Sequence, residues 1–144
     1  MNQKVKISKV NDLIIQGTAS TPEIYFKQSG HLSIKGKSLP EDPKKFYRPL
    51  FSWAEELSAE NVQLDIRLEY VNTSSSKNIL EFIKMVDSSN SVRHLNLNWY
   101  YEIDDIDMLE FGEIIEKRLK RAKAKFIEYY DIDDNLKIQE NEFN

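Results

Sequence analysis

Apolar and polar residues alternate along several short segments of this chain, which is the period of a strand with one buried face. The clearest segment runs from Val62 to Tyr70. Similar short segments predict further strands at Leu13 to Thr18, Glu23 to Gln28, His31 to Gly36, Leu95 to Trp99 and Lys125 to Asp131. Because Ser29-Gly30 is a suitable hairpin turn, the sheet should open with an antiparallel pair.

Three other segments repeat apolar residues at helical spacing. Asp42 can cap a helix that starts at Pro43, a second helix should cover residues 75–88, and a third should run from about Ile106 through Ala122. The strands keep polar residues on their second face. We therefore predict an α/β fold, a two-layer sandwich of a mixed sheet of five to six strands with the helices mainly on one face.

Length and composition predict one domain at residues 1–131, followed by a disordered acidic tail at 132–144. The chain has no cysteine and no long apolar run, which favours a cytoplasmic protein without direct membrane insertion. A net charge of −4 argues against nucleic acid as a partner, since that binding needs clustered Lys and Arg.

The strand from Val62, the helix at 75–88 and the strand that ends near Tyr100 form a strand-helix-strand crossover. Such units place their two strands parallel, so both carboxyl ends lie at one edge of the sheet. A hydroxyl cluster that starts at Thr73 and an acidic loop with Asp104 and Asp105 should meet there, at an edge where open α/β sheets bind ligands. Tyr70 and Tyr100 end the two strands and are candidate partner contacts.

The sequence gives little support for a catalytic site or a cofactor site. The segment from Glu102 through Glu116 contains acidic but no basic residues, and basic residues follow it. This order matches the dipole of a helix and does not match the spacing of a metal-binding loop. His31 and His94 lack catalytic or metal-ligand spacing, and no glycine-rich phosphate loop is present. We expect a non-enzymatic protein without cofactor or metal; an acid-base hydrolase that uses Asp104 and Asp107 is the weakest alternative.

Four consecutive hydroxyl residues, Thr73 through Ser76, stand where a strand runs into a helix. A Thr or Ser at such a junction is commonly an N-cap. The same place suits a phosphate, because the first-turn N–H groups have no intrahelical partner and the helix dipole is positive there. The chemistry of the residues alone leaves a cap and a phosphoacceptor both open, with any of the four as acceptor.

The segment that holds this cluster, LEYVNTSSSK from Leu68 to Lys77, resembles the signature of the SiaC-like regulatory phosphoproteins. Three further segments resemble that family in the same order. They are Thr21 to Ile24 with His31 to Gly36, Pro40 to Pro43 with Phe46 to Leu50, and Asn98 to Glu102 with Asp104 to Leu109. Four blocks in order are more specific than one short motif.

The resemblance implies a STAS-like fold and a cytoplasmic phosphoprotein that works by partner switching in cyclic-di-GMP signalling and biofilm regulation. The unphosphorylated form would bind and activate a diguanylate cyclase. A Ser/Thr kinase of the histidine-kinase-like ATPase type would phosphorylate Thr73, and a PP2C-type phosphatase would reset it. The motif departs from the family at Val71, where an aromatic residue is expected.

The partner surface expected at this edge consists of Tyr70, Asn72, Ser74, Ser75, Tyr100, Asp104 and Asp105. A phosphate on Thr73 adds between about 1.5 and 2 negative charges, so it would be attracted to its helix N-terminus and repelled by the acidic loop. The alternative function is an interaction module that controls a different partner, as anti-sigma-factor antagonists of similar fold do.

Overall fold

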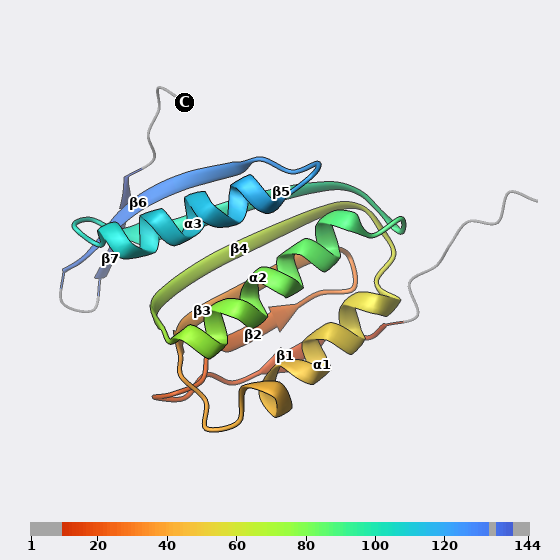
Figure 1. Cartoon of the computed structure of the whole chain (residues 1–144), viewed down its shortest axis with the longest axis horizontal. Coiled ribbons are helices and arrows are strands. Elements are labelled where there is room, and N and C mark those ends of the chain that lie inside the picture. Colours follow the sequence, from red (N-terminus) through yellow and green to blue (C-terminus); the bar gives the residue numbers. More distant parts are fainter. Residues whose placement is uncertain (1–9, 133–134, 140–144) are drawn as a thin grey trace, which may run out of the picture.

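A single mixed sheet forms the back layer of the molecule (Figure 1). In the computed structural model, which describes residues 10–132 and 135–139, the strands lie side by side in sequence order. The middle strands β3 to β6 are parallel, and the pairs at both ends are antiparallel. The strands are β1 (Leu13–Ile15), β2 (Glu23–Phe26), β3 (His31–Ser38), β4 (Ala59–Val71), β5 (Val92–Glu102), β6 (Ala124–Ile132) and β7 (Asn135–Gln139).

Three helices cover one face of this sheet (Figure 1). They are α1 (Pro43–Glu56), α2 (Thr73–Ser88) and α3 (Ile106–Arg118). The helices α1 and α2 pack against each other, whereas α3 lies apart from them over β5 and β6. The predicted two-layer α/β arrangement with helices on one face is confirmed. No helix in the described part of the chain is long and apolar enough to cross a membrane.

The core lies between the sheet and the helices. Alternate residues of the central strands are buried, and aromatic rings from three elements meet among them: Phe26 stacks on Phe82 at 5.3 Å and lies 5.1 Å from Trp53. Burial of each such side chain contributes about 1.5–3 kcal/mol. Under α3, Gly112 permits close approach to the sheet, because a Cβ there would lie 2.5 Å from the indole of Trp99.

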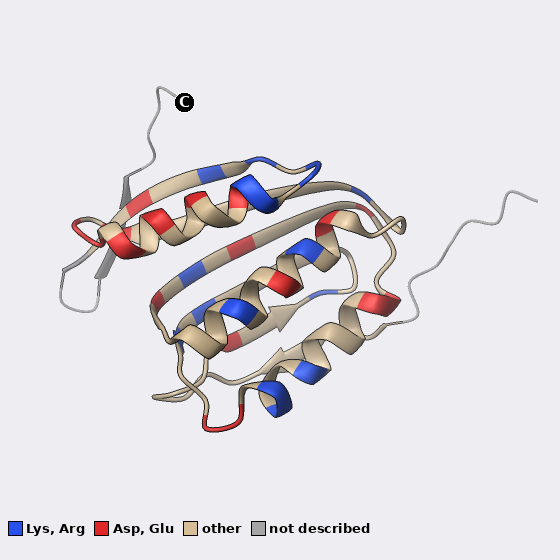
Figure 2. Cartoon of the chain, viewed as in Figure 1, with Lys and Arg blue, Asp and Glu red and all other residues tan. Residues whose placement is uncertain are grey.

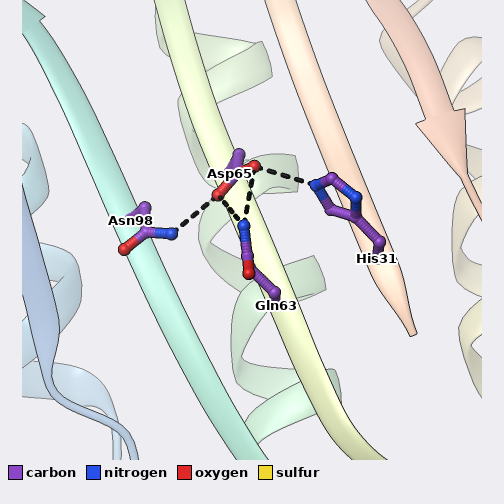
Figure 3. A network of polar contacts seen from close by, with 4 residues as sticks. All are labelled: His31, Gln63, Asp65 and Asn98. Carbon is purple, nitrogen blue, oxygen red and sulfur yellow. Dashed lines mark hydrogen bonds and ion pairs between the residues drawn. The ribbon is translucent and has the colours of Figure 1, made fainter.

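The helix-free face of the sheet carries polar side chains, as the alternation predicts. Figure 3 shows Asp65 at the centre of a network, with Oδ2 3.0 Å from Nε2 of His31 and Oδ1 accepting a hydrogen bond from Asn98 at 2.8 Å. Gln63 donates to both carboxylate oxygens of Asp65. His31 is therefore held in a network that links three neighbouring strands.

Most element boundaries differ by a few residues from the sequence prediction; the third helix, for example, ends at Arg118 and not at Ala122. The second helix starts at Thr73, two residues earlier than expected. The expected disordered tail is wrong for Asn135–Gln139, which form β7 and pair antiparallel with β6. Composition does not reveal this strand because its backbone hydrogen-bond partners come from β6. The rest of the predicted tail, residues 133–134 and 140–144, lies outside the described residues.

Candidate functional site

The hydroxyl cluster and the acidic loop lie at one edge of the sheet. Strands β4 and β5 are parallel and end at Val71 and Glu102, so the segments that follow them share that edge. A small pocket of about 170 Å³ lies at this edge, beside the acidic loop. Its lining comes from the end of β4 and the start of α3, namely Glu69, Tyr70, Val71, Asp105, Asp107, Met108 and Phe111. The sequence prediction of a shared edge is confirmed.

Asn72 is the N-cap of α2. Its side-chain oxygen accepts a hydrogen bond from the backbone N–H of Ser75 at 2.9 Å, and its carbonyl accepts one from the N–H of Ser76 at 2.9 Å. The capping role is therefore taken by Asn72, and neither Thr73 nor Ser74 supplies the cap. The cap fixes the first turn of the helix in a defined position.

Thr73 is the first residue of α2, and its side chain is exposed. Among the described residues, its hydroxyl has no hydrogen-bond partner. Lys77 follows Thr73 by four residues and is also exposed, so the two side chains lie on the same exposed side of α2. The free hydroxyl of Thr73 therefore faces solvent at the start of the helix.

The three serines after Thr73 have different environments. Ser75 has 0% exposure, and the hydroxyl of Ser38 donates to it at 2.8 Å. Ser38 also bonds the hydroxyl of Tyr47 at 2.6 Å, and burial raises the pKa of Tyr47. The prediction of a partner contact at Ser75 is therefore wrong for this conformation, because the residue faces the core like Ile79, one turn later.

Ser74 and Ser76 lie nearer the surface than Ser75 does. The hydroxyl of Ser76 donates to the backbone carbonyl of Thr73 at 2.7 Å, which ties it to the helix. Ser74 is exposed, and its carbonyl accepts from the side chain of Asn78 at 2.9 Å. Within the cluster, Thr73 and Ser74 therefore have exposed side chains, while Ser75 is enclosed.

The acidic loop supplies the N-cap of α3, as Asn72 does for α2. Asp105 caps the helix and accepts a hydrogen bond from the N–H of Met108 at 3.0 Å. Asp104 is exposed and has a positive φ of 76°, a conformation that residues with side chains rarely adopt outside tight turns. No group of three or more His, Cys, Asp or Glu residues suited to a metal ion occurs in the described ranges. The loop therefore presents Asp104 outward while Asp105 holds the helix.

The two predicted tyrosine contacts lie on opposite faces of the sheet. Tyr70 continues the buried, helix-side row of β4 but projects past the core, where it is 52% exposed and lines the pocket. Tyr100 follows the buried Trp99, so it lies on the helix-free face beside Arg67 of β4. The structure therefore brings Tyr70, and not Tyr100, to the pocket.

Sequence reasoning missed two apolar residues at this edge. Ile103 is 41% exposed and Ile106 is 58% exposed, on either side of Asp104 and Asp105. Their signal in the sequence is that both interrupt an otherwise acidic loop without belonging to a helical core pattern. Together with Tyr70 they make the edge apolar as well as acidic, which is typical of a protein contact.

Comparisons with known proteins agree on one family. The model of the SiaC family of regulatory phosphoproteins matches residues 15–129 of the chain. An uncharacterised protein of Pseudomonas aeruginosa strain UCBPP-PA14 is 33% identical over 109 residues, which cover 72% of this chain and 86% of that protein.

Solved structures are similar as well. The chain superposes on SiaC of Pseudomonas aeruginosa with a TM-score of 0.68 and 30% identity, over 80% of this chain and 97% of that one. A second match is to a crystal structure described as the diguanylate cyclase SiaD in complex with its activator SiaC, from the same organism. There the TM-score is 0.69 and the identity 28%, over 80% of this chain and 99% of the other.

Proposed function

The chain belongs to the SiaC family of regulatory phosphoproteins, and we propose that it is a phosphorylation-controlled activator of a diguanylate cyclase. In this proposal the unphosphorylated form binds and activates the cyclase. A Ser/Thr kinase of the histidine-kinase-like ATPase type phosphorylates Thr73, and a PP2C-type phosphatase removes the phosphate. The activator role is supported by the similarity to a SiaC chain solved with the cyclase that it activates.

The observation that carries the choice of acceptor is the free hydroxyl of Thr73. It is exposed at the first position of α2, and it has no hydrogen-bond partner among the described residues. Ser75 is enclosed, and Ser76 donates its hydroxyl to the backbone. A kinase needs an accessible hydroxyl that it can orient, so Thr73 and then Ser74 fit the role best.

A phosphate on Thr73 would change the charge of the whole edge. It adds about two negative charges at the positive end of α2, one turn before Lys77. An anion and a cation at i and i+4 attract each other, which favours a phosphate turned toward Lys77. Asp105 and Asp107 beside the pocket would repel the same phosphate. A partner that covers this edge would therefore meet a bulky, hydrated anion, and its removal from water costs free energy.

The test is to add the purified chain to purified diguanylate cyclases of its host and measure cyclic-di-GMP synthesis. Wild type and Thr73→Ala should stimulate the same cyclase. Thr73→Glu should stimulate it much less, because the carboxylate imitates part of the phosphate charge. Ser88→Glu is the matched control, since it adds the same charge to an exposed hydroxyl residue at the opposite end of α2, and it should stimulate the cyclase as the wild type does.

Phosphopeptide mapping of the chain from its host completes the test. Phosphate on Thr73 in the tryptic peptide from Leu68 to Lys77 supports the acceptor assignment. If no host cyclase responds to the wild type, the cyclase proposal is wrong, and a different partner recovered with Thr73→Ala would support the alternative interaction module. If phosphate occurs only on Ser74, the acceptor assignment is wrong while the activator role stands.

A further inference from the structure

A groove of about 460 Å³ runs between α1 and α2, on the flank of α2 that faces away from α3. Its apolar floor includes Pro43 and the half-buried Phe51, whose ring packs edge-on against Phe82 at 6.3 Å. Its rim is polar. The remaining lining residues are Asp42, Lys44, Ser74, Lys77, Asn78 and Glu81. The groove therefore begins in the same turn of α2 as Thr73.

The charges along α1 run against its helix dipole. Lys44 and Lys45 lie in the first turn, where the dipole is positive, and Glu55 and Glu56 lie in the last turn, where it is negative. Figure 2 shows this reversal as blue at the start of α1 and red at its far end. Each misplaced charge costs about 0.3–1 kcal/mol of helix stability. The reversal does not serve α1 itself, so an external partner of opposite charge is the better explanation.

The cations at the rim are available for such a partner. Within the described part of the chain, neither Lys44 nor Lys77 forms an ion pair. The acids of the rim are already engaged, because Asp42 caps α1 by accepting from the N–H of Lys45 at 3.2 Å, and Glu81 lies 3.6 Å from the amine of Lys84. The groove thus offers an apolar floor beside unpaired ammonium groups.

We propose that this groove docks an acidic segment of the diguanylate cyclase, in which an apolar side chain enters above Phe51 and flanking carboxylates meet Lys44 and Lys77. This docking mode rests on the proposed function, since it needs the cyclase as partner. It also gives phosphorylation a direct effect with the correct sign. A phosphate on Thr73 pairs with Lys77 at i+4 and repels carboxylates in the groove, so the partner is released.

The acidic surface around Tyr70, Ile103 and Ile106 is another exposed apolar region at the same edge of the sheet. Its charge complements a basic segment, because Asp104, Asp105 and other acids surround it. A phosphate would make that surface more negative and would strengthen its attraction for a basic partner. This electrostatic effect is opposite to release on phosphorylation, so the groove between α1 and α2 fits the cyclase better.

The test compares two double charge reversals with the cyclase that responds to the wild type. Lys44→Glu with Lys77→Glu should weaken its binding at least about tenfold, because two attractions become repulsions. Lys35→Glu with Lys125→Glu changes the net charge equally on the helix-free face and should leave the affinity unchanged. Wild-type affinity should also fall as salt rises from about 50 mM to about 300 mM.

Hydrogen exchange of the complex locates the contact independently of the variants. Slowed exchange at residues 43–51 and 74–81 supports the groove, and slowed exchange only at residues 102–114 overturns it. Equal affinities of the two double variants would also overturn the groove, while Thr73→Glu would still reduce binding if the proposed function holds. If the wild type binds no host cyclase, the proposed function fails and the docking mode fails with it.

Discussion

The two ends of the parallel sheet are built in opposite ways. At the end near the start of β5, Asp87 is 2% exposed and accepts backbone hydrogen bonds from Lys120, Arg121 and Ala122. The guanidinium of Arg121 donates to the backbone carbonyls of Asp87, Val92 and Ser89. These bonds tie α2, β5 and the loop after α3 together. The backbone N–H groups of this loop and the guanidinium of Arg121 therefore have partners inside the molecule.

At the opposite end, some exposed polar groups have no partner among the described residues. Asn72 and Asp105 each cap one helix, but the hydroxyl of Thr73 and the carboxylate of Asp104 form no hydrogen bond with the rest of the described chain. The internal bonds lie one layer below, where Ser38, Tyr47 and Ser75 are buried together. One end of the sheet is therefore closed by internal hydrogen bonds that stabilise the fold. The other end is open: it exposes unbonded groups that a partner can contact, above a buried layer that is hydrogen-bonded.

The largest expected effect tests the closed end. Asp87→Ala should lower the free energy of unfolding by about 3 kcal/mol or more, because it leaves several enclosed backbone N–H groups without an acceptor. Asp105→Ala, the matched loss of an aspartate cap at the open end, should cost only about 1 kcal/mol. Urea denaturation of both variants measures the difference. Equal losses would show that the two ends do not differ in stability.

The next effect concerns the buried support under Thr73. Tyr47→Phe should cost about 1–2 kcal/mol at neutral pH, because the hydroxyl of Ser38 loses a buried partner. Burial raises the pKa of Tyr47, so the folded chain holds the phenol proton more tightly than the unfolded chain does. Wild-type stability should therefore fall as the pH rises above about 10.

Urea unfolding at a series of alkaline pH values measures this loss. The decline should be shallower in Tyr47→Phe than in wild type. It should not vanish, because burial also raises the pKa of Tyr101. Parallel declines of the two proteins would contradict the assignment of this pH dependence to Tyr47.

A smaller effect is expected at the cap of α2. Asn72→Ala should cost about 1 kcal/mol and increase amide exchange at Ser75, since that N–H loses its acceptor. Asn72→Ser keeps a capping oxygen and should restore most of both values. If Asn72→Ala leaves the Ser75 amide protected, another group caps the helix and the first turn is not held by Asn72.

The smallest effect on stability should accompany the largest effect on regulation. Thr73→Ala should change the free energy of unfolding by no more than about 0.5 kcal/mol, because its side chain is exposed and unbonded. It should nevertheless abolish phosphorylation by the cognate kinase. Incorporation of labelled phosphate, measured beside Ser74→Ala, checks this. Equal incorporation by wild type and Thr73→Ala would exclude Thr73 as the main acceptor.

The hydrophobic pattern predicted most of the fold. Alternation in β4 and β5 and helical spacing in α2 identified the crossover unit, and its parallel strands then placed the hydroxyl cluster and the acidic loop at one edge. Both steps depend on local periods of 2 and 3.6 residues, which a single sequence displays. The strand β7 escaped prediction because it needs β6 as its partner.

The candidate site was predictable in outline but not in its details. The run from Thr73 to Ser76 reads as four equivalent hydroxyls, yet the structure encloses Ser75 and exposes Thr73. The spacing of four residues between Ser75 and Ile79 was an available signal for the burial. The reversed charges of α1 were equally visible, but their meaning required the neighbouring groove with Lys77.

The sequence by itself determined the order of the strands and helices through β6 and the resemblance to a family of regulatory phosphoproteins, which implies Thr73 as the acceptor. Only the tertiary structure decided which hydroxyls are buried, which residue caps α2 and which side chains meet in the pocket and the groove. The physical reason is that periodicity is a local property of the backbone. Burial and hydrogen-bond partnership depend on elements distant in sequence, as Ser38 and Ser75 show by meeting from β3 and α2.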